Sequence, residues 1–258
     1  MPISTERNAV AQMLGAAAKS EVLLVHSAFG GLSRASFRAE AFCEALIGAM
    51  PGATLLMPTM TWRTVTPAAP VFDELATPSH TGVLTEVFRQ HFASHRSLHP
   101  THSVAGLGPL AGYLLSSHHL GETPCPGSSP YGLMRDVDAS ILLLGVGFES
   151  CTAIHHAEET IAPDFYIKPP EEAETYTLRA RDGAAHEVRT RRHRRLPRDF
   201  PQFEPVLRSR DALRVGAVKG VAWRLFALHD LYRIVLAALT LRRDATLEQR
   251  PDARDNAP

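Results

Sequence analysis

The chain has 258 residues, which is long enough to bury a sizeable hydrophobic core, so one large domain is expected rather than two equal ones. Lysine plus arginine and aspartate plus glutamate both number 27, which gives a formal net charge of zero. Without a global electric field, the protein is not expected to be steered toward nucleic acid or an anionic membrane, and its partners must be recognised locally. The sequence does not determine the oligomeric state and leaves a homodimer open.

The cysteines and the apolar runs bear on the compartment in which the protein works. The three cysteines, Cys43, Cys125 and Cys151, are an odd number without C-x-x-C spacing, which argues against a disulfide framework and a structural zinc site. The first ten residues lack the apolar core of a signal peptide, and no uninterrupted run of about 18 apolar residues occurs. These features predict a soluble, cytoplasmic protein that does not insert into a membrane.

Helical and strand patterns alternate along the first two thirds of the chain. The predicted elements are a helix over 5–18, a strand over 21–25, a helix over 36–49, a strand over 54–58, a long ordered loop over 59–79, a helix over 82–92, a short strand within the polar stretch 96–108, a helix over 110–117, a strand over 141–147 and a helix that begins near Thr152. This alternation predicts an α/β fold.

The last third of the chain has a different character. Residues 175–180 and 185–190 alternate in the manner of strands and are joined by Arg181-Asp182-Gly183, which predicts a β-hairpin. Residues 216–239 then read as a strand followed by an amphipathic helix. Residues 244–258 are charged and poor in apolar side chains, so we expect a single domain over 1–243 and a disordered tail over 244–258.

The segment 151–159 concentrates reactive side chains directly after a buried strand, at the edge where open α/β sheets bind ligands. On a helix, His155 and Glu158 share one face, while His156 and Glu159 form a second pair about 100° further round. His155 and Glu158 are suited to be a base and its orienting carboxylate, since the carboxylate fixes the tautomer of the imidazole. Metal ligands without H-E-x-x-H spacing and solvated surface charges are the alternatives.

Cys151 stands four residues before His155, a spacing that suits a thiolate nucleophile and its base. A buried, inert cysteine is the common alternative. After the first strand, His26-Ser27 could offer backbone amides and a hydroxyl to a phosphate, or the serine could simply cap a helix. The arginine-rich run 189–198 is interpreted as a solvated face or a patch for coenzyme phosphates, and not as a nucleic-acid site, because no nucleic-acid-binding module is recognisable.

A series of short blocks in the chain resembles one known enzyme family. In order, the blocks are Leu24-Val25-His26-Ser27, Leu56-Met57-Pro58-Thr59, Phe72-Asp73, Pro78, Gly82 to Phe88, Arg96-Ser97-Leu98-His99-Pro100-Thr101-His102-Ser103-Val104-Ala105, Ser129-Pro130, Leu143-Leu144-Gly145-Val146 and Thr152 to Glu158. Their order and the combination of R-S-x-H-P-x-H-S-V-A with T-x-x-H-x-A-E resemble the aminoglycoside 3-N-acetyltransferase family over about residues 20–165.

The resemblance implies an α/β/α core with an added antiparallel β-hairpin, unrelated to the GNAT acetyltransferase fold. It implies acetyl-CoA or another acyl-CoA as co-substrate, no metal, and a small-molecule amine as acceptor. His155 would then be the catalytic base and Glu158 its orienting carboxylate. The residues that would line the coenzyme site are His26, Ser27, Ala28, Phe29, Arg96, His102, Ser103 and Thr152.

Two departures from the family pattern bear on chemistry and substrate. Cys151 stands where the family commonly has asparagine, which leaves open an acyl-Cys151 intermediate. Arginines over 189–198 occupy a region where the family tends to carry acidic residues, which would oppose a polycationic acceptor if they face the pocket. Asp73 and Glu159 are the carboxylates expected to receive an amine. A biosynthetic member with a non-polycationic substrate and a non-catalytic binding protein are therefore alternatives to an aminoglycoside-modifying enzyme.

Overall fold

The computed structural model describes residues 5–15 and 19–249, which build a mixed seven-stranded sheet. Across the sheet, the strands follow the order β4 (His95–Arg96), β5 (Val104–Leu107), β2 (Thr54–Pro58), β1 (Val22–Ser27), β6 (Ala139–Leu144), β10 (Val221–Ala227) and β9 (Arg214–Val218). β1 is parallel to both of its neighbours, β2 and β6, whereas the outer strand pairs are antiparallel. The carboxyl ends of the three parallel strands therefore meet at one edge, near the middle of the sheet.

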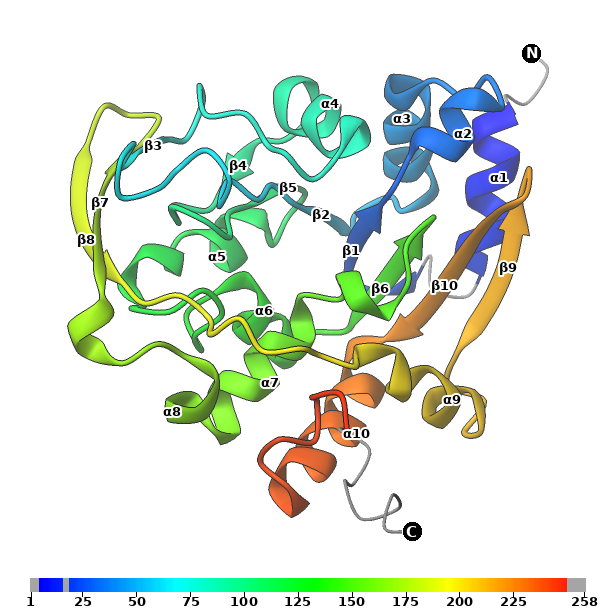
Figure 1. Ribbon diagram of the computed structural model, residues 1–258. Coiled ribbons are helices and arrows are strands. Elements are labelled where there is room, and N and C mark those ends of the chain that lie inside the picture. The colour runs from blue at the N-terminus through cyan, green and yellow to red at the C-terminus, as the bar shows by residue number, and fades with distance from the viewer. Residues whose placement is uncertain (1–4, 16–18, 250–258) are drawn as a thin grey trace, which may run out of the picture.

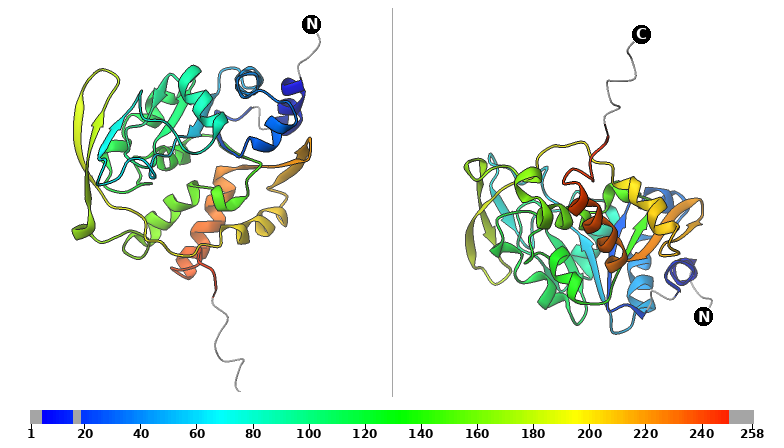
Figure 2. Two further views of the ribbon diagram at one scale, coloured as in Figure 1. Left: turned by 45° about the horizontal axis from the view of Figure 1, so that its top comes forward. Right: turned by 90° about the horizontal axis from the view of Figure 1, so that it is seen from below.

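Helices cover both faces of this sheet because its central strands are apolar on both sides. The first face carries α1 (Thr5–Leu14), α2 (Gly30–Arg34), α3 (Ala39–Ala49) and α4 (Val83–His91) (Figures 1 and 2). The second face carries α5 (Ala111–Leu115), α6 (Pro130–Leu133), α7 (Ala153–Ile161), α8 (Pro163–Tyr166), α9 (Phe203–Arg208) and α10 (Leu228–Leu241). In β1, Leu23 and Val25 pack toward the first group, and Val22 and Leu24 toward the second. The predicted α/β/α core is confirmed.

Short 3-10 turns connect several of these elements. They are η2 (His118–Leu120), η3 (Met134–Asp136), η4 (Phe148–Ser150), η5 (Pro170–Glu172) and η6 (Phe200–Gln202).

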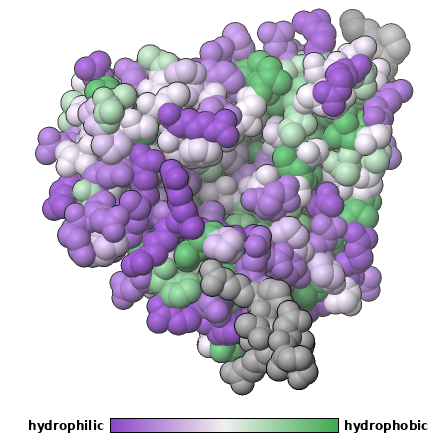
Figure 3. Space-filling view, viewed as in Figure 1, coloured by the Kyte–Doolittle hydropathy of each residue, from purple (hydrophilic) through white to green (hydrophobic). Residues whose placement is uncertain are grey.

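The predicted hairpin is present as β7 (Glu174–Arg179) and β8 (Ala185–Thr190), at the left of Figure 1. It forms a second sheet with β3 (Val71–Asp73), which pairs in parallel with β7 and lies inside the segment predicted to be a long loop. Phe72, Tyr176 and Leu178 form the small core of this sheet. After β8, residues 191–199 cross the molecule toward α9 (Figure 1), and the face that they cross is hollowed near its centre (Figure 3).

Three predicted element boundaries differ from the structure for reasons of backbone geometry. The helix predicted over 36–49 begins at Ala39, because Ser36 has a φ of 68° and separates α2 from α3. The strand predicted over 141–147 ends at Leu144, where Gly145 turns the chain with a φ of 69°. The strand predicted before α10 is a hairpin of β9 and β10, whose turn residues Lys219 and Gly220 both have positive φ.

The segment 244–249, predicted to belong to a disordered tail, is instead folded against the domain. Ala245 and Thr246 are buried, and the backbone N–H of Asp199 donates to the carbonyl oxygen of Thr246 at 2.8 Å. The rest of the predicted tail, 250–258, lies outside the described residues, as do residues 16–18 of the first predicted helix. Within the described residues, no helix has both the length and the apolar character needed to cross a membrane.

Candidate functional site

A cavity of about 660 Å³ opens where the carboxyl ends of the three parallel strands meet. We call it the strand-edge cavity. One group of wall residues lies at the ends of β1 and β2 and directly after them. It consists of 26–30, Pro58, Met60 and Trp62. The other wall residues are Val146, Glu149, Ser150, Thr152 and His155 after β6, and 80–83 together with Thr85 and His102. This location is the one that parallel α/β sheets use for ligands, as the sequence predicted.

The loops that follow β1 and β6 approach each other closely beside this cavity. The N–H of Ala28 donates to the carbonyl oxygen of Leu144 at 2.8 Å. A Cβ on Gly145 would lie 2.6 Å from the carbonyl oxygen of Ala28, so this close approach requires glycine in addition to the positive φ. The glycine after the strand therefore fixes the loop that leads to α7 and its histidines.

A second cavity, of about 920 Å³, lies against the segment that follows the hairpin. We call it the arginine cavity, and its lining residues are Trp62, Thr66, Pro67, Thr101, His102, His155, Lys168, Pro169, Glu172, Glu174, Arg192, His193, Arg194, Arg195, Leu196 and Arg198. Trp62, His102 and His155 line both cavities. His155 thus stands at the junction of two separate binding spaces.

His155 is held by Glu158 one helical turn further along α7. Its Nδ1 lies 2.7 Å from Oε2 of Glu158, which is completely buried, while the His155 side chain is 20% exposed. Because a carboxylate can only accept, Nδ1 carries the hydrogen and the lone pair of Nε2 is left for a ligand. Burial, reinforced by the neighbouring His193, lowers the pKa of His155, although Glu158 acts in the opposite direction. The imidazole is therefore neutral at neutral pH and able to accept a proton.

Glu158 receives two further hydrogen-bond donors from distant parts of the chain. Nε of Arg198 lies 3.2 Å from both carboxylate oxygens, and the hydroxyl of Thr246 donates to Oε1 at 2.6 Å. Burial alone would raise the pKa of Glu158, but His155, Arg198 and Thr246 together lower it. The carboxylate stays ionised and fixes the imidazole. Thr246 was missed by sequence reasoning, because it lies in the predicted tail.

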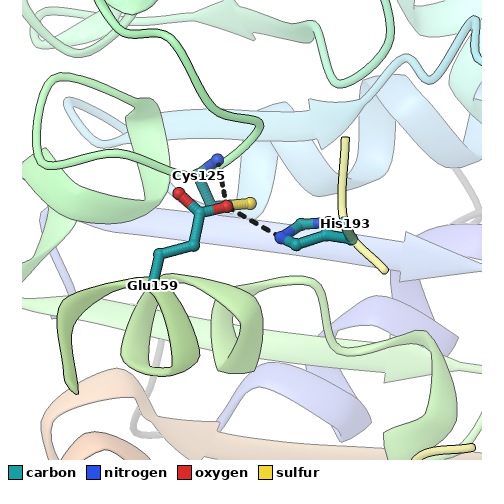
Figure 4. A group of neighbouring side chains, drawn as sticks. All are labelled: Cys125, Glu159 and His193. Carbon is teal, nitrogen blue, oxygen red and sulfur yellow. Dashed lines mark hydrogen bonds and ion pairs between the residues drawn. The ribbon is translucent and has the colours of Figure 1, made fainter. Parts of the chain in front are cut away.

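A second imidazole–carboxylate pair lies beside the first. Nε2 of His193 is 2.7 Å from Oε1 of Glu159, and Figure 4 shows Glu159 reaching from α7 toward His193 and Cys125. The N–H of Cys125 and the hydroxyl of Thr123 donate to the same carboxylate at 2.9 and 2.5 Å. The ring of His193 stacks on that of His155, with ring centroids 4.4 Å apart.

Cys125, Glu159 and His193 also bring three atoms of metal-ligand type within 4.8 Å of one another. The donor set is poorly prepared for a cation. Burial and the nearby Glu159 raise the pKa of the Cys125 thiol well above its ordinary value, and a protonated thiol is a weak ligand. Both oxygens of Glu159 already accept N–H or O–H hydrogens. Within the described residues, this group is best understood as the support of His193.

Several predicted coenzyme residues line the strand-edge cavity. These are His26, Ser27, Ala28, Phe29, His102 and Thr152. Nε2 of His26 and Oγ of Ser27 are buried without a hydrogen-bond partner, which marks them as atoms for a ligand to satisfy. Thr152 precedes the first residue of α7 but makes no side-chain capping bond, so its hydroxyl is not committed to the helix.

Arg96 and Ser103, also predicted to contact the coenzyme, line neither cavity. Arg96 is buried and donates to the carbonyl oxygens of Glu74, Thr77 and Thr59 at 3.1, 2.6 and 3.1 Å. Ser103 is buried as well, and its hydroxyl donates to the carbonyl oxygen of Thr59 at 2.7 Å. The two residues tie the loop after β2 to strands β4 and β5, so their role is structural.

The prediction of a covalent role for Cys151 is corrected by its position. Cys151 is completely buried within the hydrophobic core and lines neither cavity. Burial raises the pKa of its thiol to about 12, although the backbone N–H groups of Ala153 and Ile154 act in the opposite direction. A protonated, inaccessible thiol cannot serve as an acyl carrier at neutral pH, so we do not retain the acyl-Cys151 intermediate.

The two carboxylates predicted to receive an amine are engaged elsewhere. Oδ1 of Asp73 accepts from the N–H groups of Leu75 and Ala76 at 3.0 and 2.8 Å, which caps a turn outside both cavities. Glu159 is buried, accepts from its three partners and faces His193 rather than either cavity. Neither carboxylate lines one of the two cavities that meet at His155.

Comparison with known proteins agrees with this architecture. A family model described as aminoglycoside 3-N-acetyltransferase matches residues 24–240, which is most of the chain. The chain belongs to the aminoglycoside 3-N-acetyltransferase family. The match extends through the hairpin and α10, well beyond the segment that carries the sequence resemblance.

Individual relatives are more distant. The chain is 35% identical over 138 residues to aminoglycoside N(3)-acetyltransferase IV of Salmonella sp, and 27% identical over 164 residues to the aminoglycoside N(3')-acetyltransferase-like protein YokD of Bacillus subtilis. These alignments cover 53% and 55% of the chain, which spans 51% and 60% of the two relatives. The crystal structure of aminoglycoside acetyltransferase AAC(3)-IVa in complex with a gentamicin shares the fold, with a TM-score of 0.76, 24% identity, and coverage of 96% of this chain and 93% of that one.

Proposed function

We propose that the protein is an acyltransferase that moves an acyl group, acetyl first among them, from an acyl-CoA thioester to an amine of a small molecule. The observation that carries the proposal is the place of His155. Its neutral imidazole borders both cavities, and Glu158 orients it so that Nε2 is free. Such a base can serve two substrates, one bound in each cavity.

The step assigned to His155 is removal of a proton from the attacking amine. The amine nitrogen forms a bond to the acyl carbon while the carbon–sulfur bond of the thioester breaks. Nε2 of His155 takes the proton that the nitrogen loses. The imidazolium then gives this proton up to the departing thiolate, directly or through water, so the products are an amide and free CoA. Glu158 holds Nδ1–H and stabilises the imidazolium that forms.

Acyl-CoA would supply the activated acyl group, and the strand-edge cavity fits it better than the arginine cavity does. The unpartnered atoms of His26 and Ser27 lie there, and Ala28 and Gly30 line both this cavity and an adjoining one of about 650 Å³. That adjoining cavity is rich in glycine and is lined by Arg34, an exposed cation suited to a phosphate. The arginine cavity then remains as the binding site for the acceptor.

The acceptors named for the relatives give the first class to test. AAC(3)-IVa has been crystallised with a gentamicin, an amine-bearing aminoglycoside. For this chain, the proposal is limited to a primary amine that reaches His155 through the arginine cavity.

Release of free thiol from acetyl-CoA, followed with and without an amine panel, tests the proposal. We expect thiol release that depends on the amine and an acetylated amine of matching amount in the mass spectrum. Thiol release without an amide product would indicate a thioester hydrolase. No release with gentamicin, amino sugars or their anionic derivatives would contradict the proposal and favour a binding protein of the same fold.

A further inference from the structure

The charge on the wall of the arginine cavity is predominantly positive. Five cationic side chains line it, against two carboxylates, Glu172 and Glu174. The cations are Lys168, Arg192, Arg194, Arg195 and Arg198. A polycation that enters this space would meet net repulsion, whereas an anion would be attracted.

The carboxylates near the cavity are already neutralised by partners within the protein. Glu172 pairs with Lys168 at 2.9 Å, and Glu174 pairs with Arg192 at 2.5 Å. Behind the wall, Arg198 pairs with Glu158 at 3.2 Å. Each of these carboxylates already has a cation as partner, which weakens the attraction that it offers to the ammonium groups of an acceptor.

Arg194 and Arg195 are the cations that remain. Both are exposed, and in the described part of the chain neither has a carboxylate partner within ion-pair distance. The backbone around them is fixed, because the N–H of Arg194 donates to the carbonyl oxygen of Tyr166 at 2.7 Å and its Nε donates to that of Ile167 at 3.1 Å. Two guanidinium groups without a carboxylate partner among the described residues thus line the cavity that His155 borders. They come from a segment whose backbone is held by hydrogen bonds.

We infer that the acceptor carries an anionic group, a carboxylate or a phosphate, in addition to the amine that is acylated. Arg194 and Arg195 would bind the anion, and the amine would lie near His155. Guanidinium groups match the oxygen atoms of both anions in pairs, which gives orientation as well as attraction. The inference rests on the proposed function for the identity of the reacting amine, but the binding preference is independent of turnover.

Isothermal titration calorimetry with three probes separates these possibilities. Glucosamine 6-phosphate and glucosamine share one amine and differ by a phosphate, and gentamicin is a polycation. We expect the wild-type protein to bind glucosamine 6-phosphate at least tenfold more tightly than glucosamine, and gentamicin more weakly than either. The double variant Arg194→Ala, Arg195→Ala should lose the preference. Arg189→Ala, which removes an exposed arginine of β8 outside both cavities, should keep it.

Each other outcome has a defined meaning. Tighter binding of gentamicin than of glucosamine 6-phosphate, or no difference between the two amino sugars, overturns the inference, even if thiol release supports the proposed function. A loss of CoA affinity in the double variant with unchanged amino-sugar binding would assign the arginines to the coenzyme and also overturn it. Failure of thiol release with a retained phosphate preference would count against the proposed function alone.

Discussion

Two imidazole–carboxylate pairs lie side by side in this protein, and they differ in what their free atoms can reach. In the first pair, Glu158 binds Nδ1 of His155 and leaves Nε2 free. In the second, Glu159 binds Nε2 of His193. Both carboxylates come from α7, and the two rings are stacked. The bonded nitrogen is thus different in two pairs that otherwise look alike.

The surroundings of the two rings decide which one is suited to catalysis. His155 borders both cavities, whereas His193 borders only the arginine cavity. A group that transfers a proton during a reaction between two substrates must reach both of them. The comparison therefore supports His155 rather than His193 as the proposed base, with His193 as part of the wall of the proposed acceptor site.

Acid pH should produce the largest effect, because it acts on many buried imidazoles at once. Burial lowers the pKa of His26, His99, His102, His118 and His155. The folded state keeps these rings neutral, while the unfolded chain protonates them below about pH 6.5. Stability is therefore fully present above pH 6.5 and falls as the pH falls, by up to about 1.4 kcal/mol per ring and pH unit.

Urea unfolding at pH 7.5, 6.5 and 5.5 and constant ionic strength measures this loss. We expect a loss of about 2 kcal/mol between the first two values and a larger one, of about 5 kcal/mol, between pH 6.5 and 5.5. An unfolding midpoint that is independent of pH would mean that the imidazoles take up protons in the folded protein as readily as in the unfolded chain. That result would contradict the lowered pKa of the buried imidazoles, including that of His155.

Glu158→Gln should reduce kcat for amine-dependent thiol release by about 100-fold or more. The amide would donate to Nδ1, so the imidazole would carry its hydrogen on Nε2 and could no longer accept a proton there. Glu159→Gln is the matched control on the same helix, and its effect should be much smaller. Equal losses in the two variants, both folded by circular dichroism, would contradict the distinction between the pairs.

His193→Ala should raise KM for the acceptor about tenfold with a smaller change in kcat. The substitution removes part of the arginine cavity wall and the face on which His155 stacks, but it leaves Glu159 with Thr123 and Cys125 as partners. Steady-state kinetics with each substrate varied in turn separates the two constants. If the main effect were on KM for acyl-CoA, His193 would contact acyl-CoA and not the acceptor, which would contradict the prediction.

Thr246→Val should give the smallest effect, a fall in kcat of a few-fold and a loss of about 1–3 kcal/mol in stability. It removes one of the donors to Glu158 and the hydrogen bond to the hydroxyl of Tyr166. Thr240→Val is the matched control, because among residues 5–15 and 19–249 its exposed hydroxyl bonds only to the carbonyl oxygen of Leu236 in α10. If both variants behave alike, the segment 244–249 does not support the carboxylate.

Local sequence signals were sufficient for much of the sheet. The strand over 54–58 has the predicted bounds, because a compact apolar run is bounded by a turn before it and ends in proline. The hairpin β7–β8 was equally visible in its alternation and in the glycine of its turn. β3 was not predicted, because three residues with one buried side chain carry no periodic signal. This strand forms by pairing with β7, which lies about a hundred residues later in the chain.

The same limit explains the site. The i, i+3 spacing was enough to pair His155 with Glu158. The donors from Arg198 and Thr246 come from segments that no spacing rule connects to α7. Cys151 was predicted from its spacing to His155, and that prediction was wrong. The sequence shows which residues neighbour a thiol along the chain but not how deeply it is buried, and burial keeps this thiol protonated and inaccessible.

The single-turnover rate of amide formation in His155→Ala tests the central claim most directly. Protein in excess over acetyl-CoA would be mixed with saturating amine, after calorimetry has shown that CoA still binds. The account predicts a rate between about 100-fold and 10,000-fold below that of the wild-type protein, with His193→Ala within about tenfold of it. A near-normal rate in His155→Ala, with CoA bound and the fold intact, would contradict the assignment of His155 as the base.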